Sequence, residues 1–289
     1  MNLENINSFI NQVKDLNVLI VGETIIDEFI DVSYEGQSMK SICPVFKLDG
    51  GKVIQQGGAQ AIANHLYDFV KSVDVITNTS NEIVKTRYID ISDKKKHVEI
   101  NKFETEKFKE INVNTAEYDV VIVADFGHGF CDKLTITDGF HLMCQTNSNN
   151  FGFNRISKWK TSRKKSVCID LREASLQINK KIASPRENDI LEIFNYELNT
   201  DNLFVTTGRA GSTYTNGKAF TSQSSYKTEV LDTIGAGDTY FAFASLSAAI
   251  NFSDKLLVPS LAASLSTTWL CNEKSVTKQL LLNHASKYL

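Results

Sequence analysis

Short apolar runs alternate along the chain with longer stretches in which apolar residues recur at helical spacing. Residues 119–125 form the clearest run, and a mostly apolar segment of this length is typical of a strand buried on both faces. Because strands and helices alternate, we predict an α/β fold with a mostly parallel sheet and helices on both faces. The predicted strands are 18–21, 73–77, 119–125, 140–144, 166–169 and 203–206, and the predicted helices are 60–70, 156–159, 185–197 and 239–250.

Two segments, 28–56 and 87–104, break this alternation. They carry apolar and polar residues in turn, which predicts antiparallel strands instead of helices. On this pattern alone, the strands fit two surface hairpins with no closing role. No internal repeat or linker divides the chain, so we expect one domain spanning residues 1–289.

The composition is that of a soluble globular enzyme, with 42% hydrophobic and 22% charged residues among 289. The net charge of −3 argues against a non-specific nucleic-acid binder, which is usually basic. We expect no membrane partner either, because no apolar stretch is long enough to span a bilayer. The five cysteines are odd in number and lack C-x-x-C spacing, so we expect reduced thiols and a cytoplasmic protein. The five histidines are scattered, so we expect no dedicated protein metal cage.

The most informative segment is D-T-I-G-A-G-D at residues 232–238, which an apolar helical stretch follows. A glycine-rich turn at a helix start points backbone N–H groups outward, where the helix dipole adds partial positive charge. Such a turn can hold a phosphate, and Asp238 can take the proton of an attacking hydroxyl. The segment therefore has the groups that phosphoryl transfer to an alcohol needs. The alternative is an ordinary helix cap, with glycine in the turn and the carboxylate complementing the dipole.

This segment matches all six fixed positions of the pattern D-T-x-G-A-G-D and resembles the signature of the ribokinase-like (PfkB) carbohydrate kinases. The resemblance implies a ribokinase-like three-layer sandwich, with a mostly parallel central sheet and a small β lid over the sugar. It also implies that Asp238 is the catalytic base. The N–H groups around Gly235, Ala236 and Gly237 would then bind the transferred phosphate.

A second glycine-containing turn, T-T-G-R-A-G at residues 206–211, follows the predicted strand 203–206. It resembles the nucleotide loop of the same kinases and precedes the signature by roughly 25 residues. The resemblance assigns ATP binding to Thr207, Gly208 and Gly211, together with Asp232 and Thr233 of the signature. Mg²⁺ is expected to arrive with ATP and to be held mostly by phosphates and water.

On the acceptor side, Asp27 follows the first predicted strand, and the pair Gly57-Gly58 opens the helix that contains Asn64. Ligands of open α/β sheets bind beyond the carboxyl ends of the strands, where a carboxylate can hold two sugar hydroxyls. The kinase family likewise places an early Asp, a Gly-Gly pair and a nearby Asn against its acceptor. The expected partner is therefore a small-molecule sugar or sugar phosphate. Taken alone, each residue also fits a plain helix start after a flexible loop.

Three segments resemble the heptose-7-phosphate kinases, which form the kinase half of ADP-heptose synthases: K-T-R at 85–87, A-D-F-G-H-G at 124–129 and K-S-I-C-P-V at 40–45. The stretch 145–154 looks like one found in sugar kinases of surface-polysaccharide pathways. This resemblance adds Asp125 to the substrate side. A phosphosugar also requires cationic side chains, and the candidates in or beside the predicted lid are Arg87, Lys40 and Lys102. The alternative for each of the three is an ordinary exposed lid residue.

One departure from the family pattern concerns the N-x-x-E motif linked to the magnesium–phosphate network. The corresponding place reads L-R-E-A-S at residues 171–175, without the Asn. Either Glu173 substitutes for the motif, or Arg172 contacts phosphate directly, or the protein is an impaired kinase that only binds sugar or nucleotide. A kinase for a vitamin precursor or a nucleoside is a further alternative with the same fold. The exposed edges of lid strands favour pairing of two lids into a homodimer.

Overall fold

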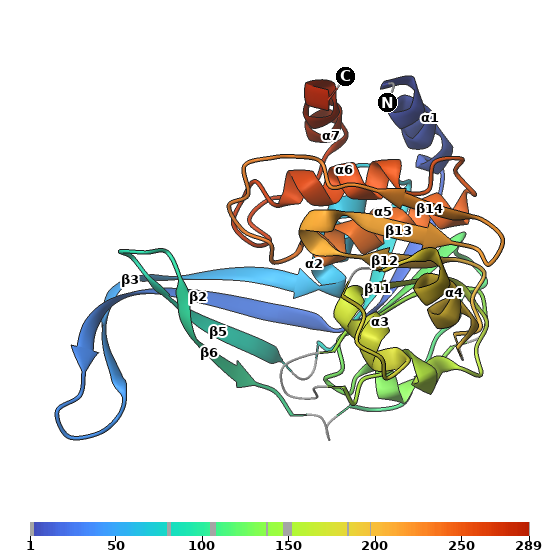
Figure 1. Cartoon of the computed structure of the whole chain (residues 1–289). Coiled ribbons are helices and arrows are strands. Elements are labelled where there is room, and N and C mark those ends of the chain that lie inside the picture. The colour runs from blue at the N-terminus through green and yellow to red at the C-terminus, as the bar shows by residue number, and fades with distance from the viewer. Residues whose placement is uncertain are drawn as a thin grey trace.

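The computed structural model describes residues 3–79, 82–104, 108–136, 138–146, 152–183, 185–196 and 198–288. A layered body carries an elongated β-sheet that projects from one side of it (Figure 1). Both chain ends lie on the same side of the body, away from the projecting sheet.

An eight-stranded sheet forms the middle layer of the body. In spatial order its strands are β14 (Phe220–Gln223), β13 (Ser212–Thr215), β12 (Leu203–Thr206), β11 (Lys164–Asp170), β10 (Phe140–Cys144), β8 (Val120–Asp125), β1 (Asn17–Gly22) and β4 (Ser72–Ile76). The pairs from β4 to β12 are parallel, whereas β13 and β14 add an antiparallel hairpin at one edge. Every residue of β8 is buried, as expected for a central strand that is covered on both faces.

Helices cover both faces of this sheet. They are α1 (Leu3–Val13), α2 (Ala59–Leu66), α3 (Leu171–Gln177), α4 (Glu187–Asn195), α5 (Ala236–Ala249), α6 (Leu257–Ser266) and α7 (Lys278–Ala285). Figure 1 shows α5, α6 and α7 on one side of the sheet and α3 and α4 on the other. The helix α5 is buried almost all round because it packs between the sheet and α6. It begins three residues earlier than predicted, which puts Asp238 in its first turn.

A second sheet, which we call the lid, has the strand order β3 (Pro44–Gly58), β2 (Thr24–Gln37), β5 (Ile83–Asp90) and β6 (Lys96–Lys102). The antiparallel pairs β2–β3 and β5–β6 join through the parallel pair β2–β5. The lid strands begin earlier than positions 28 and 87. The reason is that β2 leaves the body directly after β1, with a single residue, Glu23, between them. A separate two-stranded sheet pairs β7 (Ile111–Asn112) with β9 (Leu134–Thr135).

The six predicted body strands are present, each within two residues at either end. The other three helix predictions differ from the structure. The helix predicted over 60–70 ends at Leu66, four residues early. Residues 156–159 form only a 3-10 turn, because a turn that leads into β11 follows at once. The helix predicted from residue 185 begins at Glu187, where Asp189 accepts a hydrogen bond from the Arg186 N–H (3.1 Å). Within the stretch 145–154, residues 147–151 lie outside the described residues.

None of the helices of the described residues combines the length and the apolar character that crossing a lipid bilayer requires.

Candidate active site

The signature turn forms the start of α5. Gly235 is the cap of this helix and has a left-handed backbone (φ 83°), and a Cβ at this position would lie 2.5 Å from the Asn272 Oδ1. Only glycine fits there without strain. Gly237, in the first turn, has no atom within 4 Å of the place of a Cβ. The Ala236 N–H donates to the Thr233 carbonyl (3.3 Å), whereas the first-turn N–H of Gly237 has no acceptor among the described residues.

A cavity of about 480 Å³ lies against one side of this turn. Thr233, Ala236 and Gly237 form its wall on the signature side. Its opposite wall comes from the 206–211 turn, and hydroxyl side chains from β13, α5 and α6 contribute much of the remainder. These further lining residues include Thr206, Gly208, Gly211, Ser212, Tyr240, Ser260, Ser264 and Thr267. The cavity therefore joins the two turns that the sequence assigns to nucleotide binding.

The 206–211 turn is held in shape by its own hydrogen bonds. Thr207 donates both its N–H (2.8 Å) and its hydroxyl (2.9 Å) to the Gly211 carbonyl, so its side chain closes the turn and does not line the cavity. Gly208 and Gly211 have positive φ, and a Cβ on Gly211 would lie 2.0 Å from the Gln223 carbonyl oxygen. Both glycines are therefore needed for the backbone to approach the cavity.

Asp238 lies on the other side of the signature turn and is buried. Burial raises the pKa of Asp238 to about 7, and Asp27 adds to the rise, whereas a hydrogen bond from the Gly58 backbone and the charge of Lys85 oppose it. A carboxyl group with a pKa near neutrality can exchange a proton with a substrate hydroxyl. The structure thus brings Asp238 together with Gly58 and Asp27, as the sequence predicts.

The Asp27 carboxylate lies at the base of the lid. It forms an ion pair with the Arg87 guanidinium, whose Nε also binds Glu99 (2.8 Å). A Cβ on Gly57 would lie 2.6 Å from the Asp27 Oδ2, so glycine leaves room beside this carboxylate. Burial raises the pKa of Asp27, although Arg87 opposes the rise. The predicted residues Asp27, Gly57, Gly58 and Arg87 therefore form one group beside Asp238.

Two residues of this region were not assigned a role from the sequence. Lys85 faces the site from β5, and alternation with Arg87 on the same strand is a signal that could have identified it. Asn272 lies between Gly57 and Gly235, and its backbone N–H donates to the Gln55 Oε1 (2.8 Å). No local pattern marks Asn272, because it reaches the site from the loop after α6.

The sequence predicts that Asp232 binds ATP, but in the structure its carboxylate faces the lid. Its carboxylate binds the Lys96 ammonium of the lid (2.8 Å and 3.0 Å) and does not line the cavity. It also accepts the Ile234 N–H (3.1 Å). Asp232 therefore connects the lid with the signature turn.

The structure separates two of the predicted lid cations from the site. Lys40 lies in the turn beyond Gln37, and a strand rise of about 3.3 Å per residue puts Gln37 roughly 33 Å from Asp27. Lys102 pairs with Val84 on β5, so alternation places it on the lid face opposite to Lys85. Both lysines are exposed, and within one chain neither reaches the residues around Asp238.

Asp125 was predicted to bind substrate, but its carboxylate is buried and already engaged. It accepts hydrogen bonds from the Trp159 Nε1 (2.8 Å), the Asn154 Nδ2 (3.1 Å) and the Gly127 N–H (3.1 Å). The Lys158 ammonium neutralises it at 2.7 Å. Asp125 therefore fixes the loop after β8 and has no free oxygen to offer a sugar.

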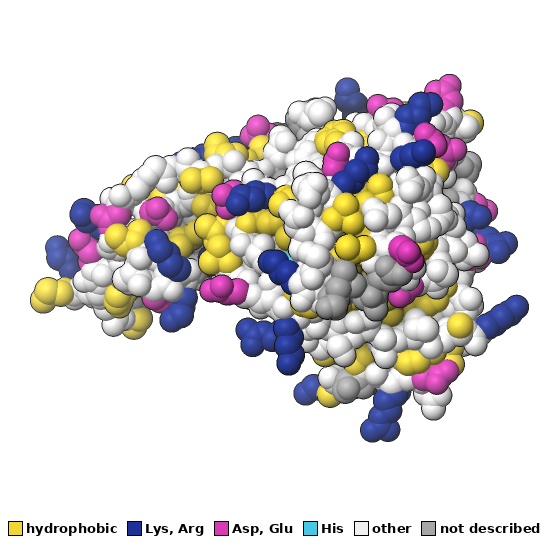
Figure 2. Space-filling view, turned by 90° about the horizontal axis from the view of Figure 1, so that it is seen from above, with side chains coloured by type: hydrophobic (Ala, Val, Ile, Leu, Met, Phe, Trp, Pro, Cys, Tyr) yellow, Lys and Arg dark blue, Asp and Glu magenta, His cyan; other side chains and the backbone are white. Residues whose placement is uncertain are grey.

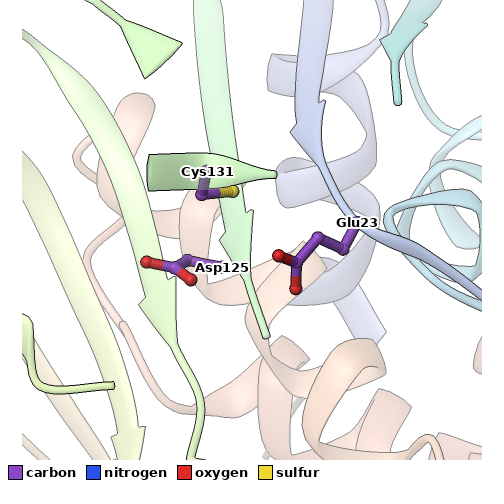
Figure 3. Close-up of side chains that lie close together, drawn as sticks. All are labelled: Glu23, Asp125 and Cys131. Carbon is purple, nitrogen blue, oxygen red and sulfur yellow. The ribbon is translucent and has the colours of Figure 1, made fainter. Parts of the chain in front are cut away.

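Asp125 also belongs to a buried group with Glu23 and Cys131 that has the composition of a metal site (Figure 3). The Glu23 carboxylate accepts three backbone N–H groups, from Phe126, His128 and Phe130 (2.9–3.1 Å). Burial raises the pKa of the Cys131 thiol well above its usual value, so it stays protonated. With both carboxylates engaged and the thiol neutral, we interpret the group as structural.

Residues 171–175, which stand in place of the N-x-x-E motif, also make hydrogen bonds that hold the local structure. Glu173 is buried, and its two oxygens accept the Asp170 N–H (2.8 Å) and the Thr146 N–H (3.1 Å). Asp170 in turn caps α3 by accepting the Glu173 N–H (2.7 Å). Asp170 lines the cavity together with Gln145, whereas Glu173 and Arg172 do not.

A chain of hydrogen bonds supports the signature turn from behind. The Val276 N–H donates to the His65 Nδ1 (3.0 Å), so the His65 Nε2 carries the proton and donates to the Thr239 hydroxyl (2.9 Å). Thr239 donates to the Gly235 carbonyl (2.9 Å). Burial lowers the pKa of His65 to about 4, so this residue stays neutral. The predicted acceptor residue Asn64, next to His65 in α2, is half-buried and accepts a hydrogen bond from Gln60 (3.0 Å).

Comparison with known proteins supports this arrangement. The profile of the pfkB family carbohydrate kinases matches residues 166–268, about a third of the chain. This part of the chain includes most of the cavity wall and the whole signature. A comparison with curated proteins finds no significant match.

Several solved structures have the same architecture. The ribokinase from Thermotoga maritima is similar with a TM-score of 0.65 at 12% identity, over 94% of this chain and 99% of that one. The nucleoside kinase from Methanocaldococcus jannaschii has a TM-score of 0.63 at 18% identity, over 95% and 99% of the two chains. Arabidopsis thaliana ribokinase, solved with ribose and ATP, has a TM-score of 0.63 at 12% identity, over 93% and 98%. The body and the lid together therefore form a ribokinase-like fold.

Proposed function

We propose that the protein is a pfkB family carbohydrate kinase that transfers the γ-phosphoryl group of ATP to a hydroxyl of a sugar or sugar phosphate. One observation carries this proposal. The signature turn separates a cavity large enough for part of a nucleotide from a lid-covered group of polar residues, and Asp238 faces the latter. The phosphoryl donor and the acceptor would therefore meet across Gly235, Ala236 and Gly237.

In this reaction the acceptor hydroxyl loses its proton to the Asp238 carboxylate. The hydroxyl oxygen forms a bond to the γ-phosphorus while the bond between that phosphorus and the bridging oxygen of ADP breaks. The Gly237 N–H, which has no acceptor among the described residues, stabilises the charge on the phosphoryl oxygens with the help of the helix dipole. Asp27 and the backbone at Gly57 orient the acceptor.

ATP and Mg²⁺ fit the chemistry of the cavity. The hydroxyl-rich wall can bind ribose and base, and the Gly208–Gly211 turn leaves space for the phosphates. Asp170 is exposed at the cavity, with Gln145 beside it, and would supply the hard oxygen ligand that Mg²⁺ prefers. Bound Mg²⁺ would neutralise phosphate charge.

We also propose that the protein is cytoplasmic and that it forms a homodimer. The surface of the lid supports the homodimer. Figure 2 shows hydrophobic side chains along the projecting lid, and several are more than half exposed. They include Tyr34, Met39, Ile42, Leu48, Val53, Ile54 and Ile100. Such a surface is typical of a protein contact. Light scattering after size exclusion should show twice the chain mass, with a shift to monomer for Ile54→Lys, whereas a monomeric wild type would contradict the dimer.

The kinase proposal is tested by incubating the protein with Mg·ATP and a panel of free sugars and sugar phosphates, heptose 7-phosphates included. ADP release is measured together with product mass. A gain of one phosphate on an acceptor, lost in Asp238→Asn, supports the proposal. ATP binding without turnover on any acceptor favours the impaired, binding-only alternative. Turnover confined to a nucleoside or a vitamin precursor would reassign the acceptor but keep the reaction.

A further inference from the structure

Lys85 lies on the face of the lid that looks toward the body. Its position in β5 is opposite Asp27 of β2 and Asn101 of β6. Side chains of directly paired residues on neighbouring strands lie on the same face of a sheet. Lys85 therefore shares its face with Asp27, and also with Arg87, which follows two residues later.

The acidic neighbours of Lys85 have other partners. Arg87 binds two of these acids, Asp27 through Nη1 and Glu99 through Nε. Asp238 accepts a hydrogen bond from the Gly58 backbone. No hydrogen bond or ion pair joins the Lys85 ammonium to any of the residues that the structure describes. Burial lowers the pKa of Lys85, as expected for a desolvated cation that lacks a close anionic partner.

The ammonium also lies where the two substrates would meet. Lys85 and Asp238 interact electrostatically, although one is on the lid and the other on α5. Asp27 lies beside Gly57, and Asp238 is bound by the next residue, Gly58, so the lid charges and the base face the same small region. Asp27, Glu99 and Arg87 together have a net charge of −1, which makes Lys85 the available positive charge of the group.

We propose that Lys85 is a catalytic residue of the lid that contacts a phosphate group bound between the lid and the signature turn. This inference rests on the proposed kinase function. In the transfer step Lys85 stays protonated and gives up no atom. It stabilises the phosphoryl oxygens while the acceptor proton moves to Asp238 and the bond to ADP breaks. Because β5 carries this charge, the site is complete only when the lid is in place.

The phosphate has two chemical sources, the phosphoryl group in transfer or a phosphate already present on the acceptor. The first source predicts that removal of the ammonium lowers kcat for every acceptor and leaves the acceptor KM nearly unchanged. The second predicts a higher KM, confined to phosphorylated acceptors. Either outcome supports contact between Lys85 and phosphate and identifies its source.

The primary experiment does not depend on turnover. Inorganic phosphate is titrated by calorimetry into wild type, Lys85→Met and Lys85→Arg, each saturated with Mg·ADP and each free of it. Lys102→Met is the matched control, because Lys102 is a lid cation on the opposite face. We expect Lys85→Met to weaken phosphate binding by about tenfold or more, with ADP affinity unchanged, and Lys85→Arg to restore part of the loss.

Equal phosphate affinity of wild type and Lys85→Met would overturn the inference, even if the kinase activity is found. Equal losses in Lys85→Met and Lys102→Met would also overturn it, because a general change of lid charge would then explain the effect. If no acceptor is turned over but phosphate binding depends on Lys85, the proposed function fails while this contact stands. An Arg variant that binds phosphate also shows that the substituted lid is folded.

Discussion

The Lys96 ammonium of the lid lies 2.8 Å from the Asp232 carboxylate, the first residue of the signature turn. This ion pair couples the position of the lid to the turn that would hold phosphate under the proposed function. The Lys96 side chain is 30% exposed and that of Asp232 10% exposed, so the pair is partly shielded from water.

We expect Lys96→Met to weaken closure of the lid. Partly exposed ion pairs contribute up to about 1 kcal/mol, so the acceptor KM should rise by up to about fivefold. ATP hydrolysis without acceptor should also increase, since an open lid admits water. Steady-state kinetics of both reactions test this expectation. Lys95→Met is the control, because Lys95 is exposed and its one ion pair among the described residues is with the nearby Asp93. Identical kinetics of the two variants would contradict the coupling.

The pH dependence of turnover should report Asp238. This residue accepts a proton only when ionised, and its pKa is raised to about 7. We therefore expect kcat/KM to fall as the pH drops below about 7, approaching a tenfold loss per pH unit. Initial rates between pH 5 and 9, at saturating Mg·ATP, measure this profile. A profile that stays flat down to pH 5 would show that Asp238 is not the base.

Asp238→Asn should abolish turnover and stabilise the fold. A carboxyl group whose folded pKa exceeds its usual 3.8 favours the protonated folded state. Its contribution to stability is therefore fully present below 3.8 and is lost as the pH rises through about 7. Asn avoids this loss, so the variant should be more stable at pH 8 by on the order of 2 kcal/mol.

Urea unfolding of wild type and Asp238→Asn at pH 4.5 and pH 8 gives the two free energies of unfolding. The gain should be large at pH 8 and should shrink at pH 4.5, where the wild-type carboxyl is protonated. A variant that is less stable than wild type at pH 8 would refute the argument.

Gly235→Ala and Gly237→Ala form a matched pair within one turn. Gly235 has a positive φ and would place a Cβ 2.5 Å from Asn272, so its variant should lose about 1–3 kcal/mol of stability and most activity. Gly237 has open space, and its variant should keep the wild-type free energy of unfolding. Equal unfolding midpoints of the two variants in urea would argue against a strained turn at Gly235.

Asp125→Asn should act on stability and not on acceptor recognition. The change leaves the Lys158 ammonium without its buried partner, which typically costs about 3–5 kcal/mol. Asp132→Asn removes the other, exposed carboxylate bound to Lys158 (2.7 Å) and should cost less than about 1 kcal/mol. Chemical unfolding and the acceptor KM are measured for both variants. A stable Asp125→Asn protein with a raised acceptor KM would contradict the structural role and support substrate binding by Asp125.

The sequence predicts the fold well because its signals are local. Continuous apolar runs such as 119–125 identify the buried strands, and the glycines of 235–237 mark a helix start. The lid was also predicted, because period-two alternation needs no knowledge of the tertiary structure.

The residues of the site could be predicted only where several of them form a recognisable motif within a short segment of the sequence. Gly57, Gly58 and Asp238 meet as predicted. Asn272 and the partner of Asp232 could not be found, since both contacts join segments more than a hundred residues apart in the chain. The sequence also does not show that Asp125 is engaged in a buried hydrogen-bond network, because a polar residue at a strand end suits such a network as well as a ligand site.

The cavity wall is drawn entirely from residues after position 144, whereas the lid is built before position 103. Under the proposed function, the two ligands would be recognised by different parts of the chain, and the lid meets the signature turn around Asp238, Asn272 and the Lys96–Asp232 pair. The matched family profile covers only residues of the later half. Under the proposed function, substitutions in the lid strands would change acceptor choice while the cavity for the phosphate donor stays unchanged, so exchange of the lid strands alone is a rational route to altered substrate choice.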